Sequence, residues 1–414
     1  MGRAGEAGRR ERDRVMAARN AAAPTTVADL EDLKPELTAL RRSLHQRPEL
    51  AFQEHATSSR VAGLLTEWGY EVVTGLAGTG LVATLRAGSG ARRLGLRADM
   101  DALPISETTG LPYASQAEGR MHACGHDGHM AMLLGAARHL ARTRKFSGVL
   151  HLIFQPAEER GFDSGAKRMV EEGLFKRFPC DMVLAMHNHP GAPVGQFLTR
   201  SGPFMAAGDR VFVKVIGNGG HAARPQLATD PVVAAAAIVM ALQTVVSRNI
   251  DPSQAAVVSV GRLRAGDALN VIPGEAEIGI SVRSFSPQVR ARLRERIVRI
   301  CESTAESHEA SVQIDYVEGY PVVDNAAAPT ALALEVARAL VGQEQVIGDM
   351  PALMGSEDFA YMMQAVPGAL VRIGNGTADG GRALHNANYD FNDDNLCVGA
   401  AFWSRLAETY LRDA

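Results

Sequence analysis

The sequence is poor in cysteine, in net charge and in long apolar runs, and each shortage excludes a class of protein. Its four cysteines are far apart and follow no disulfide spacing, so we expect a reducing, cytoplasmic setting. The formal net charge of −3 argues against nucleic-acid and membrane-surface binding, because both partners select basic patches. No apolar run reaches the roughly 18 residues that a transmembrane helix needs.

The N-terminal segment has the composition of an unfolded extension. Residues 1–26 are rich in Arg, Ala, Gly and Glu and contain no apolar core, which does not fit a secretory signal. The start at Met1-Gly2 also lacks the Ser or Thr of a myristoylation signal. We therefore predict that residues 1–28 form a disordered extension.

Length and apolar patterning predict an α/β fold with more than one domain. A chain of 414 residues exceeds one ordinary compact core. Leucines at three- and four-residue steps predict a helix over residues 30–44, and residues 128–142 are also helical in pattern. Alternation of such helices with short apolar strands indicates a mostly parallel sheet with helices on both faces. The strands are expected at residues 80–85, 93–97, 149–154 and 182–186.

Residues 207–317 show a different order of elements, β-α-β-β-α-β, which is typical of a ferredoxin-like α+β unit. Asp230-Pro231 supplies the N-cap and the first position of its first helix. We expect residues 207–317 to be inserted in a larger domain made of residues 29–206 and 318–414. The elements of the insert are expected at residues 210–216, 230–246, 256–263, 275–283, 287–306 and 311–317.

Acidic residues and histidines directly follow three of the predicted strands. The three pairs are Asp99 with Asp101, Glu158 with Glu159, and His187 with His189. Between the first two pairs, Cys124-Gly-His126-Asp-Gly-His129 opens the helix at 128–142. Open parallel sheets bind ligands at the carboxyl ends of their strands, so we expect these side chains to meet at one edge.

These residue types suit a divalent metal. Thiolate, imidazole and carboxylate are the ligands of Zn²⁺ and its first-row neighbours, and a bound ion would keep Cys124 deprotonated. Gly125 lets the backbone curl so that Cys124 and His126 can address the same ions. Of the adjacent Glu158 and Glu159, one can hold metal while the other takes a proton from an activated water.

Each residue also has an ordinary structural interpretation. A single buried His is more often a hydrogen-bonded core residue, a lone Cys packs as a small hydrophobe, and paired glutamates are usually solvated. The joint occurrence of four clusters at strand ends favours the metal site. The histidines without such support are expected to be structural, namely His45, His55, His139, His151 and His308.

A loose dinucleotide-binding pattern occurs at Gly217, Gly219 and Ala222. Pro225 and the late start of the next helix leave no helix N-terminus beside this loop to bind a pyrophosphate. A dinucleotide site is therefore not expected.

Several motifs in matching order resemble one family. The sequence from about residue 30 to the C-terminus is similar to hippurate hydrolases, plant indole-acetyl-amino acid hydrolases and bacterial N-acyl-amino acid amidohydrolases, which are relatives of aminoacylase and the zinc glutamate carboxypeptidases. The motifs are Arg97-Ala-Asp-Met-Asp-Ala-Leu-Pro104, Cys124-Gly-His-Asp-Gly-His129, Gln155-Pro-Ala-Glu-Glu159, Met186-His-Asn-His-Pro190, Asn218-Gly-Gly-His-Ala-Ala-Arg-Pro225, Gly355-Ser-Glu-Asp358 and Leu384-His-Asn386.

The resemblance implies a site for two divalent metal ions. Glu158 would be the general base, and Asp99 would orient a metal-binding group from behind. An alternative for Asp99 is to cap a turn together with Asp101. The implied ligands are Cys124, His126, Glu159, His187 and His385.

The thiol is a departure from part of this family. The aminoacylase and carboxypeptidase branches carry a metal-bridging Asp in the region of Cys124 to His126, so Cys124 places the chain in the hippurate-hydrolase branch. The native metal stays open: Mn²⁺ or Zn²⁺ is expected first, and Co²⁺ or Ni²⁺ also suits such ligands.

The resemblance also gives roles to the insert. His221 would reach the metal site of a neighbouring subunit and stabilise an oxyanion, which makes a homodimer, or a tetramer, the expected assembly. Asn270 and Arg283 match lid residues that hold the substrate carboxylate, for which an Arg fork is suited. The alternative for Arg283 is an exposed residue at a strand end.

The expected function is hydrolysis of an N-acyl-L-amino acid, a small molecule, to a carboxylate and an amino acid. A dipeptidase or carboxypeptidase on the same site is the second hypothesis, although no carboxylate that would bind a free ammonium group is evident. A non-catalytic metal- or metabolite-binding protein is a third hypothesis. The intact pair of Glu158 and Glu159 argues against it.

Overall fold

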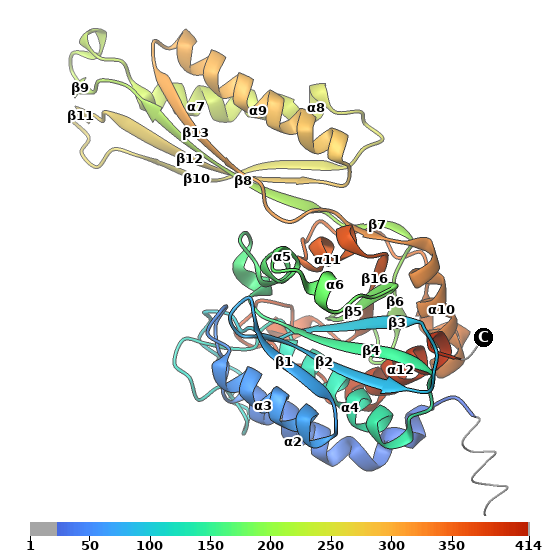
Figure 1. The fold of residues 1–414 in the computed structure, drawn as a ribbon. Coiled ribbons are helices and arrows are strands. Elements are labelled where there is room, and N and C mark those ends of the chain that lie inside the picture. Colours follow the sequence, from blue (N-terminus) through green and yellow to red (C-terminus); the bar gives the residue numbers. More distant parts are fainter. Residues whose placement is uncertain (1–22, 413–414) are drawn as a thin grey trace, which may run out of the picture.

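A computed structural model describes residues 23–412 of the chain. It consists of a larger body built on an eight-stranded sheet and a smaller body built on a four-stranded sheet (Figure 1). Most of the predicted N-terminal extension lies outside the described residues. Residues 23–28, however, belong to the folded chain: Thr25 is buried and bonds Glu408, and a 3-10 helix, η1, spans Val27–Leu33.

The large sheet has the order β1-β2-β4-β3-β5-β16-β6-β15. Its central strands β4, β3, β5 and β16 are parallel to one another. At one side, β2 is antiparallel to β4 and β1 is antiparallel to β2; at the other side, β6 is antiparallel to β16. The predicted mostly parallel sheet is therefore confirmed. The strands are β1 Glu71–Leu76, β2 Gly80–Ala87, β3 Arg93–Asp99, β4 Gly148–Gln155, β5 Met182–His189, β6 Phe197–Leu198, β15 Val346–Ile347 and β16 Gly368–Gly374.

Helices cover both faces of this sheet, as predicted (Figure 1). Within β5, Leu184 packs into the core on one face, while Val183 and Ala185 pack into the core on the other. Burial on both faces explains why the central strands are continuous apolar runs. One layer contains α2 Lys34–His45, α3 His55–Glu67, α4 His126–Thr143, α10 Ala327–Val341 and α12 Asn395–Tyr410, and the other contains α5 Gly165–Glu171, α6 Leu174–Arg177 and α11 Phe359–Ala365.

The smaller body has the predicted ferredoxin-like order. Its antiparallel sheet β10-β12-β8-β13 packs one face against α7, α8 and α9. Asp230 caps α7 by accepting hydrogen bonds from the backbone of Val232 and Val233 at 2.8 and 3.3 Å. The elements are β8 Ala207–Ile216, α7 Pro231–Leu242, α8 Thr244–Asn249, β10 Ala256–Ala265, β12 Glu275–Ser284, α9 Pro287–Ser307 and β13 Ser311–Val317.

Two predicted helices are interrupted in the structure. The helix expected at 30–44 is the 3-10 helix η1 followed by α2, with Pro35 in the first turn of α2. Proline has no N–H to donate to the preceding turn, so it starts a helix but does not continue one. The helix expected at 230–246 likewise divides at Gln243 into α7 and α8. Among residues 23–412, no helix has both the length and the apolarity to cross a membrane.

A buried ion network fastens α2 to the start of α4. The fully buried Arg41 donates from Nε to Asp127 at 2.8 Å, and Nδ1 of His45 lies 2.9 Å from the same carboxylate. Nε2 of His45 lies 3.3 Å from Glu107. Burial alone would lower the pKa of His45, but Asp127 and Glu107 raise it to about 9. His45, predicted to be structural, thus belongs to a buried ion network with Arg41, Asp127 and Glu107.

The raised pKa of His45 predicts a pH dependence of stability. The imidazole is protonated in the folded state up to about pH 9 but in the unfolded chain only up to about 6.5. Its contribution is therefore full below about pH 6.5 and is lost as the pH rises to about 9. The difference in free energy of unfolding between wild type and His45→Gln should shrink over this interval. Denaturant titrations at several pH values measure it, and a difference that does not change with pH would contradict the assignment.

Candidate functional site

The predicted metal ligands come together at the carboxyl edge of the large sheet. They open onto a cavity of about 600 Å³ between the two bodies, lined by Cys124, Glu159, His187 and His385 among others. A larger cavity of about 860 Å³ runs along α9 and contains none of these residues. The side chains predicted at the strand ends thus meet at one edge of the sheet, as the strand-end rule predicted.

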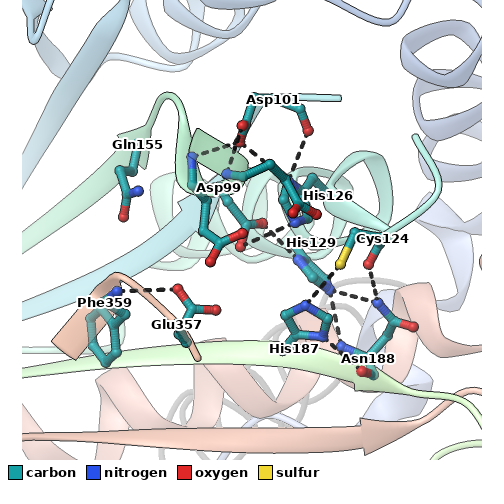
Figure 2. A network of polar contacts seen from close by, with 12 residues as sticks. Asp99, Asp101, Cys124, His126, His129, Gln155, His187, Asn188, Glu357 and Phe359 are labelled. Atoms are coloured by element: carbon teal, nitrogen blue, oxygen red, sulfur yellow. Dashed lines mark hydrogen bonds and ion pairs between the residues drawn. The ribbon is translucent and has the colours of Figure 1, made fainter. Parts of the chain in front are cut away.

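Cys124, His126 and His187 form the buried part of the cluster (Figure 2). Sγ of Cys124 lies 3.3 Å from Nε2 of His187. Nδ1 of His126 lies 2.8 Å from the carbonyl oxygen of Asp101, and Nδ1 of His187 lies 2.7 Å from that of Asn188. Because a carbonyl only accepts, Nδ1 of His126 carries hydrogen and its Nε2 keeps a lone pair for an ion. Nδ1 of His187 also lies 3.1 Å from Nη1 of the buried Arg372.

Glycine is required between the first two of these residues. Gly125 has a φ of +87°, and a Cβ at this position would lie 2.4 Å from both Asn188 Nδ2 and Tyr389 Oη. The turn that aims Cys124 and His126 at one place therefore depends on the missing side chain.

Glu159 and His385 complete the cluster on the cavity side. Nε2 of His385 lies 3.0 Å from Oε1 of Glu159, and these two side chains form a second group with Cys124. The backbone N–H of His385 donates to the carbonyl of Ala123 at 2.8 Å, and its φ of +62° is left-handed. Non-glycine residues adopt this conformation rarely, and it is enriched at functional sites.

The side chains present fit two adjacent metal ions. Cys124 is shared between one group with His126 and His187 and another with Glu159 and His385, and the ligand atoms of each group lie within 4.8 Å of one another. Nε2 of His126 is buried and has no hydrogen-bond partner in the described chain. Burial and the nearby Glu159 and Glu158 raise the pKa of the Cys124 thiol, so a cation is needed to hold it as thiolate.

Glu158 lies beside the candidate ligands and forms no salt bridge with any described residue. It begins the 3-10 helix η2, Glu158–Arg160, directly after β4. Burial raises its pKa well above the ordinary value, and the neighbouring carboxylates of Glu357 and Glu159 raise it further. A carboxyl group of this kind is suited to carry a proton.

Asp101, to which the sequence analysis gave no role in the chemistry, holds the backbone of Glu158 and Glu159 in place. Its carboxylate accepts hydrogen bonds from the backbone N–H of Glu158 at 2.9 Å and of Glu159 at 3.0 Å. Its carbonyl accepts from His126. One buried residue thus fixes Glu158, Glu159 and His126 relative to β3. The position of Asp101 in the motif beside Asp99 could have suggested this role.

Asp99 reaches the cluster indirectly. Its carboxylate accepts from Nδ1 of His129 at 2.7 Å, and Nε2 of His129 accepts from the backbone N–H of Asn188 at 3.0 Å. Both nitrogens of His129 are therefore occupied, which excludes it as a ligand. The carboxylate of Asp99 lies 3.7 Å from Nε2 of His126. It bonds a side chain on α4 and caps no turn.

A second group of buried acids was not assigned a role from sequence. Arg97, which is fully buried, donates to Asp99 at 2.7 Å, to Glu357 at 3.0 Å and to Asp358 at 3.1 Å. Burial raises the pKa of Asp358 to about 8, although Arg97 opposes this. The Gly355–Asp358 motif is therefore the acidic partner of a buried arginine at the floor of the cavity.

The three residues predicted in the insert separate into two places. Arg283 lines the cavity and donates to Oγ of Ser356 at 3.2 Å. His221 and Asn270 are exposed at the far tip of the smaller body, where β9 Gly220–His221 pairs with β11 Val271–Ile272 (Figure 1). Within one chain, neither His221 nor Asn270 meets the metal cluster.

The sheet architecture, the inserted unit and the cluster define a metallopeptidase-like class, and the chain belongs to Peptidase family M20/M25/M40, whose match covers residues 95–409. It is 42% identical to hippurate hydrolase of Campylobacter jejuni over 386 residues, which cover 93% of this chain and 99% of that protein. It is 37% identical to N-acetyl-L-cysteine deacetylase of Bacillus subtilis over 92% of this chain and 90% of the relative.

A solved structure shows the same fold. The YXEP protein of Bacillus subtilis, described as a dinuclear metal binding peptidase from the M20 family, superposes with a TM-score of 0.79 at 33% identity, covering 92% of this chain and 99% of that one. The resemblance inferred from the motifs is confirmed.

The contacts of Asp101 predict its importance. Asp101→Ala removes the acceptor for two backbone N–H groups, so η2 should loosen and metal retention and kcat should fall about 10- to 100-fold. Elemental analysis after dialysis and steady-state kinetics measure the two effects. Asp181→Ala is a matched control, because Asp181 accepts the backbone N–H of Arg93 at 2.7 Å at the opposite end of β3. Equal behaviour of the two variants would refute the role of Asp101.

Proposed function

We propose that this protein is a metal-dependent amidohydrolase that cleaves the amide bond of N-acyl-L-amino acids. The observation that carries the proposal is the position of Glu158, a buried carboxyl group with a raised pKa beside a ligand cluster that opens onto a cavity of about 600 Å³. Activity of relatives on hippurate and N-acetyl-L-cysteine, as their names state, supports the substrate class.

The proposed metal ligands are the five residues of the cluster. Two divalent ions held there would polarise the scissile carbonyl and lower the pKa of the attacking water. Mn²⁺ or Zn²⁺ is proposed first, and Co²⁺ or Ni²⁺ also fits thiolate, imidazole and carboxylate ligands. The ligands are Cys124, His126, Glu159, His187 and His385.

The proposed chemistry assigns proton transfer to Glu158. Its carboxylate takes a proton from the attacking water and delivers it to the departing amine nitrogen, as a raised pKa allows. Asp101 keeps the backbone of Glu158 in place, and Asp99 positions His129. Glu158 thus acts as base in the first half of the reaction and as acid in the second.

The proposed assembly is a homodimer in which the insert, residues 207–317, acts as lid and dimerisation unit on a catalytic domain of residues 29–206 and 318–414. The support is the distance between the tip at β9 and β11 and the cluster of the same chain (Figure 1). His221 of the partner subunit would donate to the oxyanion formed at the scissile carbonyl, and Asn270 would join Arg283 in holding the substrate carboxylate. A tetramer made of two such dimers is compatible with this arrangement.

The acids of the cavity favour an acylated substrate over a free peptide. Glu158, Glu159 and Glu357 line it within the described part of the chain. The first two are assigned to the base and a ligand, and Glu357 pairs with Arg97 at 3.0 Å. No acid is left there for the ammonium group of a dipeptide. The four free cysteines support a reducing, cytoplasmic setting. Hydrolysis of N-acyl amino acids compared with dipeptides, with each metal added, tests the proposal.

The base assignment predicts a specific loss. Glu158→Gln keeps the size and the ligand set, so metal content should stay near wild type while kcat falls by at least ~10³ because proton transfer is removed. Metal analysis and kinetics on the same preparation decide it. Turnover retained at full metal load would refute the role.

The thiol assignment predicts coupled losses. Cys124→Ser should lower metal retention and activity together, because a hydroxyl is a far poorer ligand than a thiolate at neutral pH. The measurement is elemental analysis after a graded chelator treatment. Cys301→Ser is the control, since Cys301 is buried in the core of the smaller body away from the cavity. Unchanged retention in Cys124→Ser would mean that the thiol only packs.

The dimer assignment predicts complementation between two inactive variants. In a mixed dimer of Glu158→Gln and His221→Ala chains, one site combines an intact Glu158 with an intact His221 from the partner. Equal amounts that re-associate at random give half mixed dimers, so about a quarter of wild-type activity should return. The chains are co-expressed with different tags, and the isolated mixed dimers, which have one competent site of two, should show about half of wild-type activity. No activity in these mixed dimers would exclude action of His221 across the interface.

A further inference from the structure

Two arginines of the smaller body face the cavity together. Arg210 on β8 and Arg283 on β12 both line it. In the pairing of these antiparallel strands, Arg210 is opposite Ser281 and Arg283 is opposite Gly208. Residues opposite one another, and residues two apart on one strand, share a face of the sheet. The arginines are therefore diagonal neighbours about 7–8 Å apart at the backbone, within reach of one anion.

Neither guanidinium has an acidic partner among residues 23–412. Arg283 donates to the neutral hydroxyl of Ser356 at 3.2 Å, and Arg210 lies over the ring of Phe162 at 5.6 Å. Asp209 points to the other face of β8, where its carboxylate accepts from Nε of Arg290 at 3.0 Å and from the Tyr316 hydroxyl at 3.1 Å. Asp209, the acid nearest in sequence to Arg210, is thus already paired with Arg290.

Glycines make room for both side chains. A Cβ at Gly208 would lie 1.9 Å from Nη1 of Arg283, and a Cβ at Gly161 would lie 2.3 Å from Nη2 of Arg210. The guanidinium of Arg283 thus packs against the backbone of Gly208, and that of Arg210 against the backbone of Gly161. A side chain at either glycine would prevent this packing. Burial lowers the pKa of Arg283, and the charge of Arg210 lowers it further. An anion between them would relieve both effects.

The side of the cavity formed by the larger body is mostly acidic, and its one arginine, Arg372, already contacts Nδ1 of His187 at 3.1 Å and the carbonyl of Asn188 at 3.3 Å. Glu158, Glu159 and Glu357 lie there with the metal cluster. A substrate whose scissile amide lies at the cluster therefore turns its amino-acid portion toward the arginines. One arginine suffices for the α-carboxylate that every N-acyl amino acid has, which leaves the second without a partner unless the side chain is also an anion.

We propose that Arg210 is a specificity-determining residue, which with Arg283 selects N-acyl derivatives of acidic amino acids. Arg283 takes the α-carboxylate and Arg210 takes the side-chain carboxylate of a glutamate or aspartate conjugate. This inference rests on the proposed function, because it names the substrate class of the same site.

The test compares two substrates that differ by one charge. N-acetyl-L-glutamate and N-acetyl-L-glutamine have nearly the same shape, and wild type should show a kcat/KM at least 10-fold higher for the glutamate. In Arg210→Gln this ratio should fall to about 1. Arg292→Gln is the matched control and should keep the wild-type ratio, since Arg292 is exposed on α9, pairs with Glu295 and lies outside the cavity.

Two results would overturn the inference: a wild type that does not distinguish the substrates, and an Arg210→Gln variant in which both rates fall while their ratio is retained. The second result would make Arg210 a structural contact to Phe162.

Binding separates this inference from the proposed function. Calorimetry with the metal-loaded Glu158→Gln protein measures the affinity for both compounds without turnover. Tighter binding of N-acetyl-L-glutamate, lost when Arg210→Gln is added, supports the subsite even if no N-acyl amino acid is hydrolysed. Equal binding overturns the subsite and leaves the amidohydrolase proposal intact if hydrolysis is observed.

Discussion

The acids buried at the carboxyl edge of the large sheet need cations or hydrogen-bond donors to balance their charge. Arg97 does this for Asp99, Glu357 and Asp358, and Arg41 does it for Asp127 behind the site. Arg372 reaches the candidate ligands from one side, with Nη1 3.1 Å from Nδ1 of His187, but no arginine or lysine forms a salt bridge with Glu159 in the described chain. Glu159 is thus left without an arginine or lysine partner, and it lies beside the thiol and imidazole groups that, with carboxylates, divalent ions prefer as ligands.

Local rules of the sequence predicted the fold class and most of the candidate site. Apolar strands followed by His187 or Glu158 could be placed at one edge because parallel strands share a direction. His385 could not be placed in this way: it follows no predicted strand and was inferred only from the resemblance. The bonds of Asp101 to the backbone of η2 also join segments far apart in the chain, and no periodicity reports such contacts.

The smaller body connects two regions that a single chain keeps apart. Strand β8 begins beside the cavity, where Gly208 and Arg210 lie, and leads away toward His221 at the tip. One rigid sheet therefore presents cationic side chains to its own catalytic body and an imidazole to solvent. A movement of this sheet would therefore displace the cavity arginines and the tip of the smaller body together.

The order of the ligands along the chain bears on biosynthesis. Cys124 and His126 leave the ribosome early, whereas His385 emerges only after the whole insert and after β16, which enters the sheet between β5 and β6. Domains begin to fold during translation, yet this centre is completed only when nearly all 414 residues exist. A chain that ends before His385 therefore contains only part of the cluster of side chains at this edge of the sheet.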